Sequence, residues 1–287
     1  MRISEILSCG KPSLSMEVFP PKTYDDYSKI ESAVDRISQL RPDFMSVTYG
    51  AGGGTSAFTA SIAKNIQERS GVPALAHLTC ISSDRAKISG QIALMKEYGI
   101  ENVLALRGDK LPDRSYDQCE FEYAYQLIEE IKKQGDFCIG GACYPESHPE
   151  SRSYKDDVRY LKMKVDAGCS FLTTQMFFDN DILYNFLYRA REAGITVPII
   201  AGIMPVTRAN QIMRIVKISN NTLPPKFLRI VDRYGDDPAA MKQAGIAFAS
   251  EQIIDLYANG VNAVHLYTMN DPEVAAKIKE NISDIIK

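Results

Sequence analysis

The chain has 287 residues, of which 45% are hydrophobic, and its formal net charge is -3. This length and composition suit a well-packed globular protein, and we interpret residues 1–287 as a single catalytic domain. The mixed charges form no basic stripe, which argues against nucleic acid as a partner. No apolar run approaches the roughly 18 residues that span a membrane. Because the N-terminus lacks the pattern of a signal peptide, we expect a cytoplasmic protein.

Short apolar runs that suit buried strands alternate with amphipathic stretches along the chain. The expected strands are, in order, Leu14–Val18, Phe44–Thr48, Ala74–Leu78, Val103–Leu106, Cys138–Ala142, Phe171–Thr174, Ile199–Gly202 and Ala263–Leu266. Apolar residues spaced by three or four positions predict helices within Tyr27–Leu40, Ile88–Tyr98, Phe121–Ile131, Val158–Ala167, Ile182–Ala193, Ile246–Tyr257 and Val274–Ile285. This alternation predicts an α/β protein.

The number of strands favours one architecture. Eight strands alternating with helices predict a (β/α)8 TIM barrel, a fold of typically about 250 residues. An open doubly wound sheet, which usually has fewer strands, is the alternative. The turn Pro224-Pro225-Lys226 predicts an extra helix before the long Ala239–Tyr257 helix, and therefore before the last strand.

The cysteines and histidines indicate neither disulfides nor a metal site. The six cysteines are scattered without a C-x-x-C pair, so we expect free thiols in a reducing compartment. The three histidines lack the spacing of metal ligands, and we expect no metal. The glycine-rich segment Gly50–Gly54 lacks the lysine of a P-loop. It therefore indicates only a sharp turn or a close approach of the backbone to another group.

Polar residues follow the apolar strands, at the end of a barrel that carries its chemistry. The segment Asn102–Asp109 is the most informative, because an apolar strand ends abruptly in Arg107, Gly108 and Asp109. Corresponding positions of the other strands hold Glu17, Thr48, Tyr49, His77, Thr79, Tyr144, Thr174, Gln175, His265 and Tyr267. We expect these side chains to surround one site.

Glu17 differs from the other polar residues because it lies inside an otherwise apolar strand. Partial burial favours the protonated carboxyl group, which could then act as a general acid near neutral pH. A structural ion pair with a neighbouring lysine or arginine is the alternative.

Eight short motifs follow one another over nearly the whole chain. They are Ser15–Pro21, Val47–Gly53, His77–Cys80, Leu106–Asp109, Cys143–Pro149, Thr173–Asp179, Gly202–Pro205 and His265–Asn270. Each motif is weak alone, but together and in this order they resemble the methylenetetrahydrofolate reductases. The length is similar to that of the compact bacterial members of this family.

The resemblance implies an FAD-dependent enzyme that reduces 5,10-methylenetetrahydrofolate to 5-methyltetrahydrofolate. The hydride would come from NADH or NADPH and pass through the flavin in a ping-pong reaction. The resemblance makes Glu17 the acid that helps to open the methylene bridge. It places Asp109 between flavin and pterin, and it makes Gln175 a contact of nicotinamide and pterin in turn. Gln211 would be a further folate contact, and relatives form homo-oligomers.

The resemblance also implies a set of cofactor contacts, among which Thr48 touches nicotinamide. The set comprises Thr48, Tyr49, Ala51, His77, Arg107, Gly108, Asp109, Ala124, Tyr144, His148, Asp157 and Lys164. Arg107 and Lys164 suit phosphate groups, with a solvated surface charge as the alternative. Asp157 could accept from ribose hydroxyls or stabilise the first turn of its helix. His148 could cover the cofactor or satisfy a loop carbonyl.

Some positions depart from the family pattern. Asp271 stands where relatives commonly place an arginine that meets the glutamate tail of folate. Ile215 stands near a position where some relatives carry a phenylalanine that packs on the substrate. Ser151, Tyr160 and Met163 also differ from residues around the cofactor of close relatives. A second hypothesis is therefore a flavin-bearing subunit of a larger complex that receives electrons from a partner protein. A non-flavin barrel lyase is a distant third, because no strand ends in an evident Schiff-base lysine.

Overall fold

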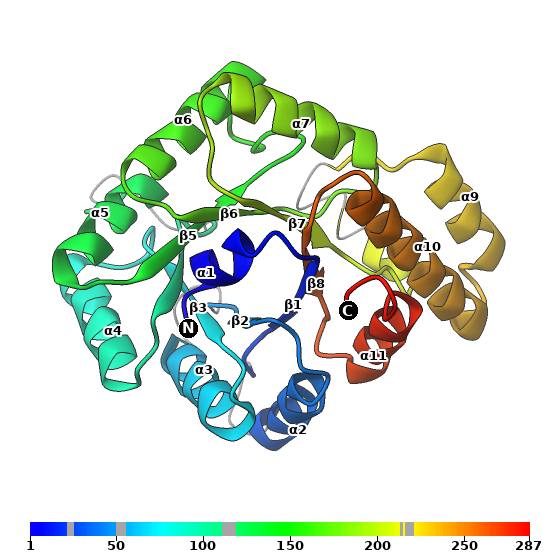
Figure 1. Ribbon diagram of the computed structural model, residues 1–287, viewed down its shortest axis with the longest axis horizontal. Helices are drawn as coiled ribbons and strands as arrows, with labels where there is room; N and C mark the ends of the chain where they lie inside the picture. Colours follow the sequence, from blue (N-terminus) through cyan, green and yellow to red (C-terminus); the bar gives the residue numbers. More distant parts are fainter. Residues whose placement is uncertain (22–25, 50–55, 111–118, 213–214, 216–220) are drawn as a thin grey trace.

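The computed structural model describes residues 1–21, 26–49, 56–110, 119–212, 215 and 221–287. Eight parallel strands form a closed barrel in which each strand pairs with the next and β8 pairs with β1 (Figure 1). The strands are β1 Ser13–Val18, β2 Met45–Val47, β3 Ala74–Thr79, β4 Asn102–Leu106, β5 Cys138–Cys143, β6 Phe171–Thr174, β7 Ile199–Ile203 and β8 Ala263–Tyr267. Each lies within one residue of its predicted bounds. The predicted TIM barrel is confirmed, and the open sheet is wrong.

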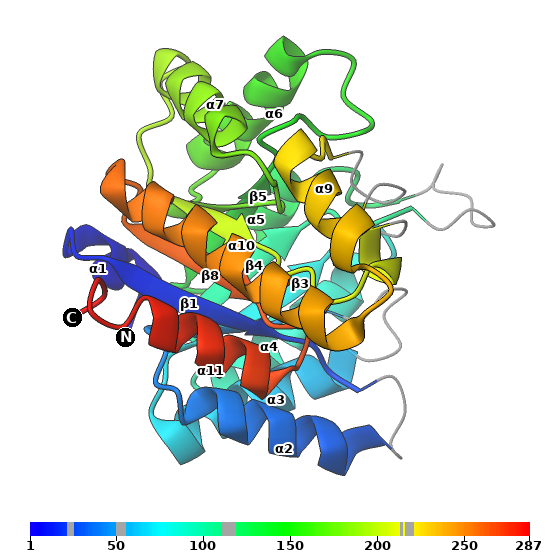
Figure 2. The same ribbon diagram turned by 90° about the vertical axis from the view of Figure 1, so that its right-hand side faces the viewer.

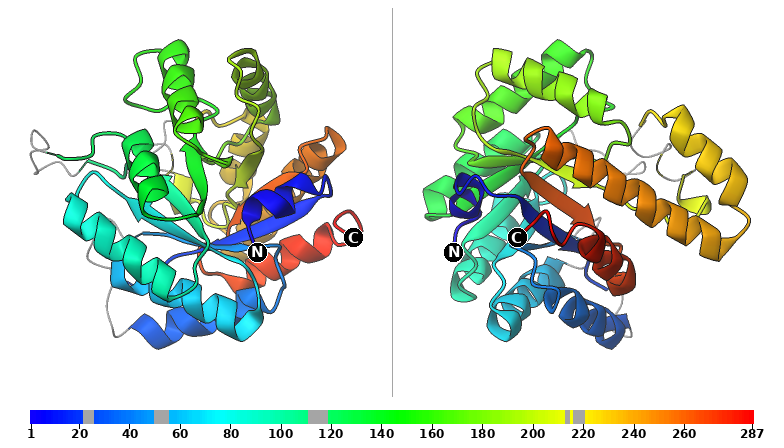
Figure 3. Two further views of the ribbon diagram at one scale, coloured as in Figure 1. Left: turned by 60° about the vertical axis from the view of Figure 1, so that its left-hand side comes forward. Right: turned by 45° about the vertical axis from the view of Figure 1, so that its right-hand side comes forward.

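Helices surround the barrel wall (Figure 2). They are α1 Ile3–Ser8, α2 Tyr27–Ser38, α3 Ser56–Ser70, α4 Arg85–Glu97, α5 Ala124–Gln134, α6 Tyr154–Asp166, α7 Asn180–Glu192, α9 Pro225–Tyr234, α10 Pro238–Ala258 and α11 Pro272–Asn281. The extra helix is confirmed as α9, which lies beside α10 at the edge of the molecule (Figure 3). Helices α1 and α3 were not predicted. None of the helices described is both long and apolar enough to cross a membrane.

Side-chain caps fix where many of these helices begin. Asp84 and Ser153 accept main-chain N–H groups at the starts of α4 and α6, and Asp179 does so at α7. Asp237 and Asp271 each accept two N–H groups at the starts of α10 and α11. Such caps satisfy donors that have no partner inside the helix. Asp271, where an arginine was expected from the family pattern, therefore has a local structural role in this chain.

An apolar layer closes the barrel at the amino ends of its strands. The layer consists of Ile3, Phe44, Leu75, Leu104, Cys138, Phe171 and Ile200, all buried. Helix α1 lies across this end of the barrel (Figure 1). The main-chain N–H of Ile3 donates to Asn102 Oδ1 at 2.9 Å, which attaches the helix to β4. Among the described residues, this layer fills the amino end, so the site opens toward the carboxyl ends of the strands.

Candidate active site

A cavity of about 750 Å³ lies at the carboxyl ends of the strands. The structure brings most of the predicted site residues together in its lining. These are Glu17, Thr48, Tyr49, His77, Arg107, Gly108, Asp109, Ala124, Tyr144, His148, Asp157, Lys164 and Gln175. Gln211 is not among the lining residues, and Ala51, with the glycine-rich segment around it, lies outside the described residues. In the part of the chain that is described, no group of three or more potential metal ligands occurs.

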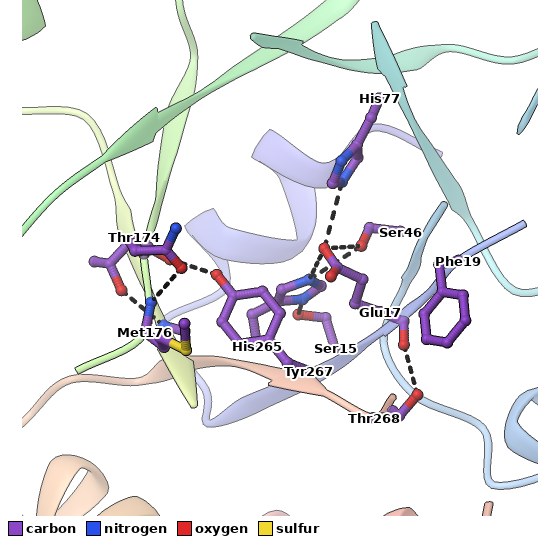
Figure 4. Close-up of polar contacts among 12 residues, drawn as sticks. Ser15, Glu17, Phe19, Ser46, His77, Thr174, Met176, His265, Tyr267 and Thr268 are labelled. Carbon is purple, nitrogen blue, oxygen red and sulfur yellow. Dashed lines mark hydrogen bonds and ion pairs between the residues drawn. The ribbon is translucent and has the colours of Figure 1, made fainter. Parts of the chain in front are cut away.

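Glu17 lies at the base of this cavity, on β1, with its side chain 19% exposed. Its Oε2 atom is 3.4 Å from Ser46 Oγ and 3.7 Å from Nε2 of both His77 and His265 (Figure 4). Strand pairing explains the closest contact, because Glu17 and Ser46 are register partners across β1 and β2. Among the described residues, no lysine or arginine pairs with Glu17. The alternative of a structural ion pair with such a residue is therefore not supported.

The hydrogen bond of Ser15 to the main chain favours one tautomer of a neutral His265. Ser15 donates its hydroxyl proton to the carbonyl oxygen of Val264 at 3.1 Å, so its oxygen accepts from His265 Nδ1 at 2.7 Å. The proton of a neutral His265 ring is thus on Nδ1, and Nε2 accepts from Ser46 Oγ at 3.0 Å. Phe44 stacks on the ring with centroids 5.8 Å apart. Two serine hydroxyls and the Phe44 ring therefore fix the orientation of the His265 ring.

His77 contributes a neutral ring to the same centre. Burial lowers the pKa of His77 to about 4, because a charged imidazole is poorly solvated there. At neutral pH the contact between His77 and Glu17 is therefore not a charged pair. Within the described structure, His77 Nε2 has no hydrogen-bond partner. A bound ligand could supply one.

The outer part of the cavity carries a bidentate ion pair. The Arg107 guanidinium donates to both carboxylate oxygens of Glu150, at 2.8 and 2.6 Å. Lys110 Nζ lies 3.9 Å from Glu150 as well. The hydrogen bonds to Arg107 lower the pKa of Glu150, and they raise the pKa of Arg107. The strongest candidate for a phosphate-binding cation thus already has an anionic partner, which the sequence did not reveal.

Gly108 lets the chain leave β4 close to β3. Its φ of +87° is a conformation that favours glycine, and a Cβ atom would lie only 3.1 Å from Thr79 Cβ. Asp109 follows directly and is exposed at the cavity mouth. The glycine therefore brings Arg107 and Asp109 to the same rim.

The alternatives for three further residues can now be compared. Lys164 donates to the carbonyl oxygen of Ala142, and burial lowers its pKa, so it is not a solvated surface charge. Asp157 both lies in the first turn of α6 and accepts from Ser151 Oγ at 2.8 Å. His148 accepts from the main-chain N–H of Glu150 at 3.1 Å through Nδ1. All three also line the cavity, which leaves a role in ligand binding open to each.

Comparisons with known proteins show the family of this chain. The family model described as methylenetetrahydrofolate reductase matches residues 2–283. The chain belongs to the methylenetetrahydrofolate reductase family. It is 38% identical over 269 residues to the 5,10-methylenetetrahydrofolate reductase of Pectobacterium carotovorum, covering 94% of this chain and 89% of the relative. It is 37% identical over 272 residues to that of Escherichia coli, covering 94% of this chain and 90% of the relative.

Longer relatives and one solved structure extend these comparisons. Methylenetetrahydrofolate reductase (NADH) 1 of Arabidopsis thaliana is 36% identical over 297 residues, which cover 98% of this chain. The chain spans only 50% of that plant relative. An uncharacterized protein from Clostridium thermocellum, which binds two copies of 5-methyl-5,6,7,8-tetrahydrofolic acid, has a TM-score of 0.61 and 14% identity over 99% of both chains. At this identity the likeness shows the fold alone.

Two positions that depart from the methylenetetrahydrofolate reductase pattern lie at the cavity. Ser151 and Tyr160 line it, whereas Met163 does not. The Tyr160 ring stacks on Tyr123 with centroids 5.3 Å apart, and the Arg159 guanidinium lies 5.1 Å from the Tyr160 ring centroid. This chain therefore has an aromatic wall at a position where polar or small residues were expected.

The segment between β7 and α9 holds the remaining predicted residues. The Gln211 side-chain oxygen accepts from the main-chain N–H groups of Thr207 and Arg208, each at 2.9 Å. Ile215 is buried in an apolar cluster with Phe178 and Phe227. Both residues thus have structural partners in this structure, and the contact of Gln211 with folate remains a prediction.

Proposed function

We propose that this chain reduces 5,10-methylenetetrahydrofolate to 5-methyltetrahydrofolate, with FAD as cofactor and NADH or NADPH as hydride donor. The observation that carries the proposal is the setting of Glu17. It is a half-buried carboxyl group at the base of a large cavity, and its neighbours are two histidines and a serine rather than a lysine or arginine. Such a group can deliver a proton to a ligand above it.

The cavity lining supports FAD as the cofactor. Arg107 and Lys164 are cations that would hold the diphosphate, and Asp157 would accept from ribose hydroxyls. His77 Nε2 and Thr173 Oγ1 are buried lining atoms with no hydrogen-bond partner in the described structure, so a polar ring could supply one. Bound FAD would supply the group that takes a hydride from the nicotinamide and passes it to the folate.

The side chains around Glu17 have defined tasks in this reaction. Glu17 would give its proton to N10 of the folate, and the bond between N10 and the methylene carbon breaks. This carbon stays on N5 as an iminium group, and the hydride converts it to the methyl group. Gln175 can bind nicotinamide and pterin in turn, because its carboxamide both donates and accepts. Asp109, at the exposed rim, would hydrogen-bond the pterin.

The proposal also covers the compartment and the oligomeric state of the enzyme. All six cysteines are free thiols, which suits the reducing cytoplasm. We expect a homo-oligomer in solution, and light scattering after size-exclusion chromatography measures its mass. A mass equal to that of one chain would refute this expectation.

Glu17→Gln tests the role of the acid. The variant keeps the size of the side chain, so it should bind FAD, and NADH or NADPH should still bleach its flavin absorption. Methylenetetrahydrofolate should then fail to restore the absorption, because the carboxamide has no acidic proton to give. Glu251→Gln is a matched control, since this carboxylate is exposed and pairs with Lys226. Both half-reactions should be normal in the control.

Three results would contradict the proposal. Absence of flavin absorption after addition of FAD would refute the cofactor assignment, and normal folate reduction by the Glu17 variant would refute the role of the acid. If neither nicotinamide bleaches the flavin while folate reoxidises the chemically reduced enzyme, electrons come from a partner protein instead.

A further inference from the structure

We propose that Ser46 is a positioning residue that connects Glu17 to His265 and lets the two side chains share a single proton. The inference rests on the proposed function, because it concerns how the acid is kept ready to protonate the folate. Ser46 is fully buried on β2, and its hydroxyl oxygen lies 3.0 Å from His265 Nε2 and 3.4 Å from Glu17 Oε2 (Figure 4). Nothing in the sequence pattern had assigned it a role.

Counting protons shows which states satisfy this arrangement. A serine hydroxyl has one proton and can also accept. When Ser15 donates to Val264 and a neutral His265 carries its proton on Nδ1, the Ser46 proton is donated to Nε2. The Ser46 oxygen then faces Glu17 Oε2 as an acceptor. With His265 neutral in this tautomer, both contacts are hydrogen bonds when Glu17 carries a proton.

A second state satisfies the same contacts with the proton moved. The O–H bond of Glu17 breaks and its proton joins Ser46 Oγ, while the former Ser46 proton moves to His265 Nε2. Glu17 is now a carboxylate that accepts from Ser46, and His265 is an imidazolium that donates to Ser46 and Ser15. No heavy atom has to move. Ser46 provides the connection, because the direct separation of 3.7 Å between Glu17 Oε2 and His265 Nε2 is too long for a hydrogen bond.

The other groups that face Glu17 do not exchange a proton with the pair of Glu17 and His265. His77 on β3 is neutral at physiological pH, because burial lowers its pKa to about 4. Tyr267 on β8 donates its hydroxyl to the carbonyl oxygen of Thr174 at 2.6 Å, and burial raises its pKa. Thr268 donates to the main-chain oxygen of Glu17, not to its carboxyl group. Neither His77 nor Tyr267 is thus a ready source of a proton for Glu17.

Loss of the shared proton leaves one hydrogen bond too few. Once Glu17 has protonated the folate, Ser46 has one proton for two acceptors, Glu17 Oε2 and His265 Nε2. As long as Ser15 donates to Val264, the protonated pair makes two hydrogen bonds through Ser46, and the deprotonated pair makes one. Ser46 therefore favours the protonated pair and keeps the acid available at higher pH.

The test compares Ser46→Ala, His265→Asn and the double variant, each loaded with FAD. We expect Ser46→Ala to slow reoxidation of the reduced enzyme by methylenetetrahydrofolate about tenfold, the size of effect that loss of a hydrogen bond to a charged group produces. Bleaching of the flavin by NADH or NADPH should be unchanged. The pH above which the folate half-reaction slows should move to lower pH, because the protonated pair has lost its extra hydrogen bond.

His265→Asn retains a hydrogen-bonding carboxamide beside Ser15 and removes the Nε2 atom that contacts Ser46. If Ser46 acts through His265, Ser46→Ala should have little further effect in this background, since effects of residues in one network do not add. Ser46→Cys, which keeps a weak donor, should be intermediate. The control is Ser38→Ala, a buried serine on α2 that donates to the carbonyl of Asp35. It should leave both half-reactions and the pH profile unchanged.

The outcomes separate this inference from the proposed function. Additive losses in the double variant, or a Ser46→Ala pH profile equal to that of the wild type, would overturn the inference and leave the reductase proposal intact. A wild-type protein that binds no flavin or does not react with the folate would overturn the reductase proposal itself. Thermal unfolding of each variant shows whether it is folded, and Ser46→Cys provides the same comparison if the alanine variant is not.

Discussion

Replacing His77 with asparagine tests how burial of this ring sets the acid stability of the protein. The folded-state pKa of His77 is about 4, against the ordinary histidine value of 6.5 in the unfolded chain. Between these values the unfolded chain binds a proton that the folded chain does not bind. Stability is therefore unaffected above pH 6.5 and is lost as the pH falls toward 4. The gap corresponds to about 3 kcal/mol of unfolding free energy.

Urea unfolding of both proteins at a series of pH values measures this loss. Between about pH 7 and about pH 4.5, the wild type should lose about 2–3 kcal/mol more than His77→Asn, whose amide does not titrate. His148→Asn is a control, because burial lowers the pKa of this half-buried ring in the same direction and the effect should be smaller. Parallel pH dependence in the wild type and His77→Asn would refute the reasoning.

Other predictions concern packing and the cavity rim. Gly202→Ala should lower the unfolding free energy by about 1–3 kcal/mol, because its Cβ would lie 2.5 Å from the Tyr267 hydroxyl. Gly90→Ala, in open space on α4, should instead raise it by about 0.5–1 kcal/mol; equal effects in denaturant would contradict the clash. Glu150→Gln should tighten FAD binding in a fluorescence titration, because Arg107 loses its competing anion. Weaker binding would mean that Glu150 orients Arg107 for the cofactor.

The strands were predictable because a barrel buries both faces of each strand, so each appears as a short apolar run. Helix α3 was missed because it follows the glycine-rich segment and buries small residues such as Ala60 and Ala63. Helix α1 has six residues, and Ile3 holds it to Asn102, which lies far away in sequence. Neither helix therefore shows the periodic pattern of large apolar residues from which the other helices were predicted.

The sequence predicted which residues lie at the strand ends, but it did not predict which of them contact one another. Glu150 lies on a loop, and only the folded chain brings it to Arg107 across 43 positions. Ser46 is 219 positions from His265 and meets it through the pairing of β1 with both β2 and β8. A polar residue inside an apolar strand was the available signal for Ser46, as it was for Glu17.

The apolar layer beneath His265 has a consequence for the timing of proton transfer. Because Phe44 and the rest of the layer fill the amino end of the barrel, the described residues leave the mouth of the cavity as the route for water to Glu17. On the proposed reaction, a bound folate covers that route. Glu17 must then take up its proton before the folate enters, and it can take up another only after the product leaves. The apolar layer thus makes the single proton taken up before binding the only one available to Glu17 while a folate is bound.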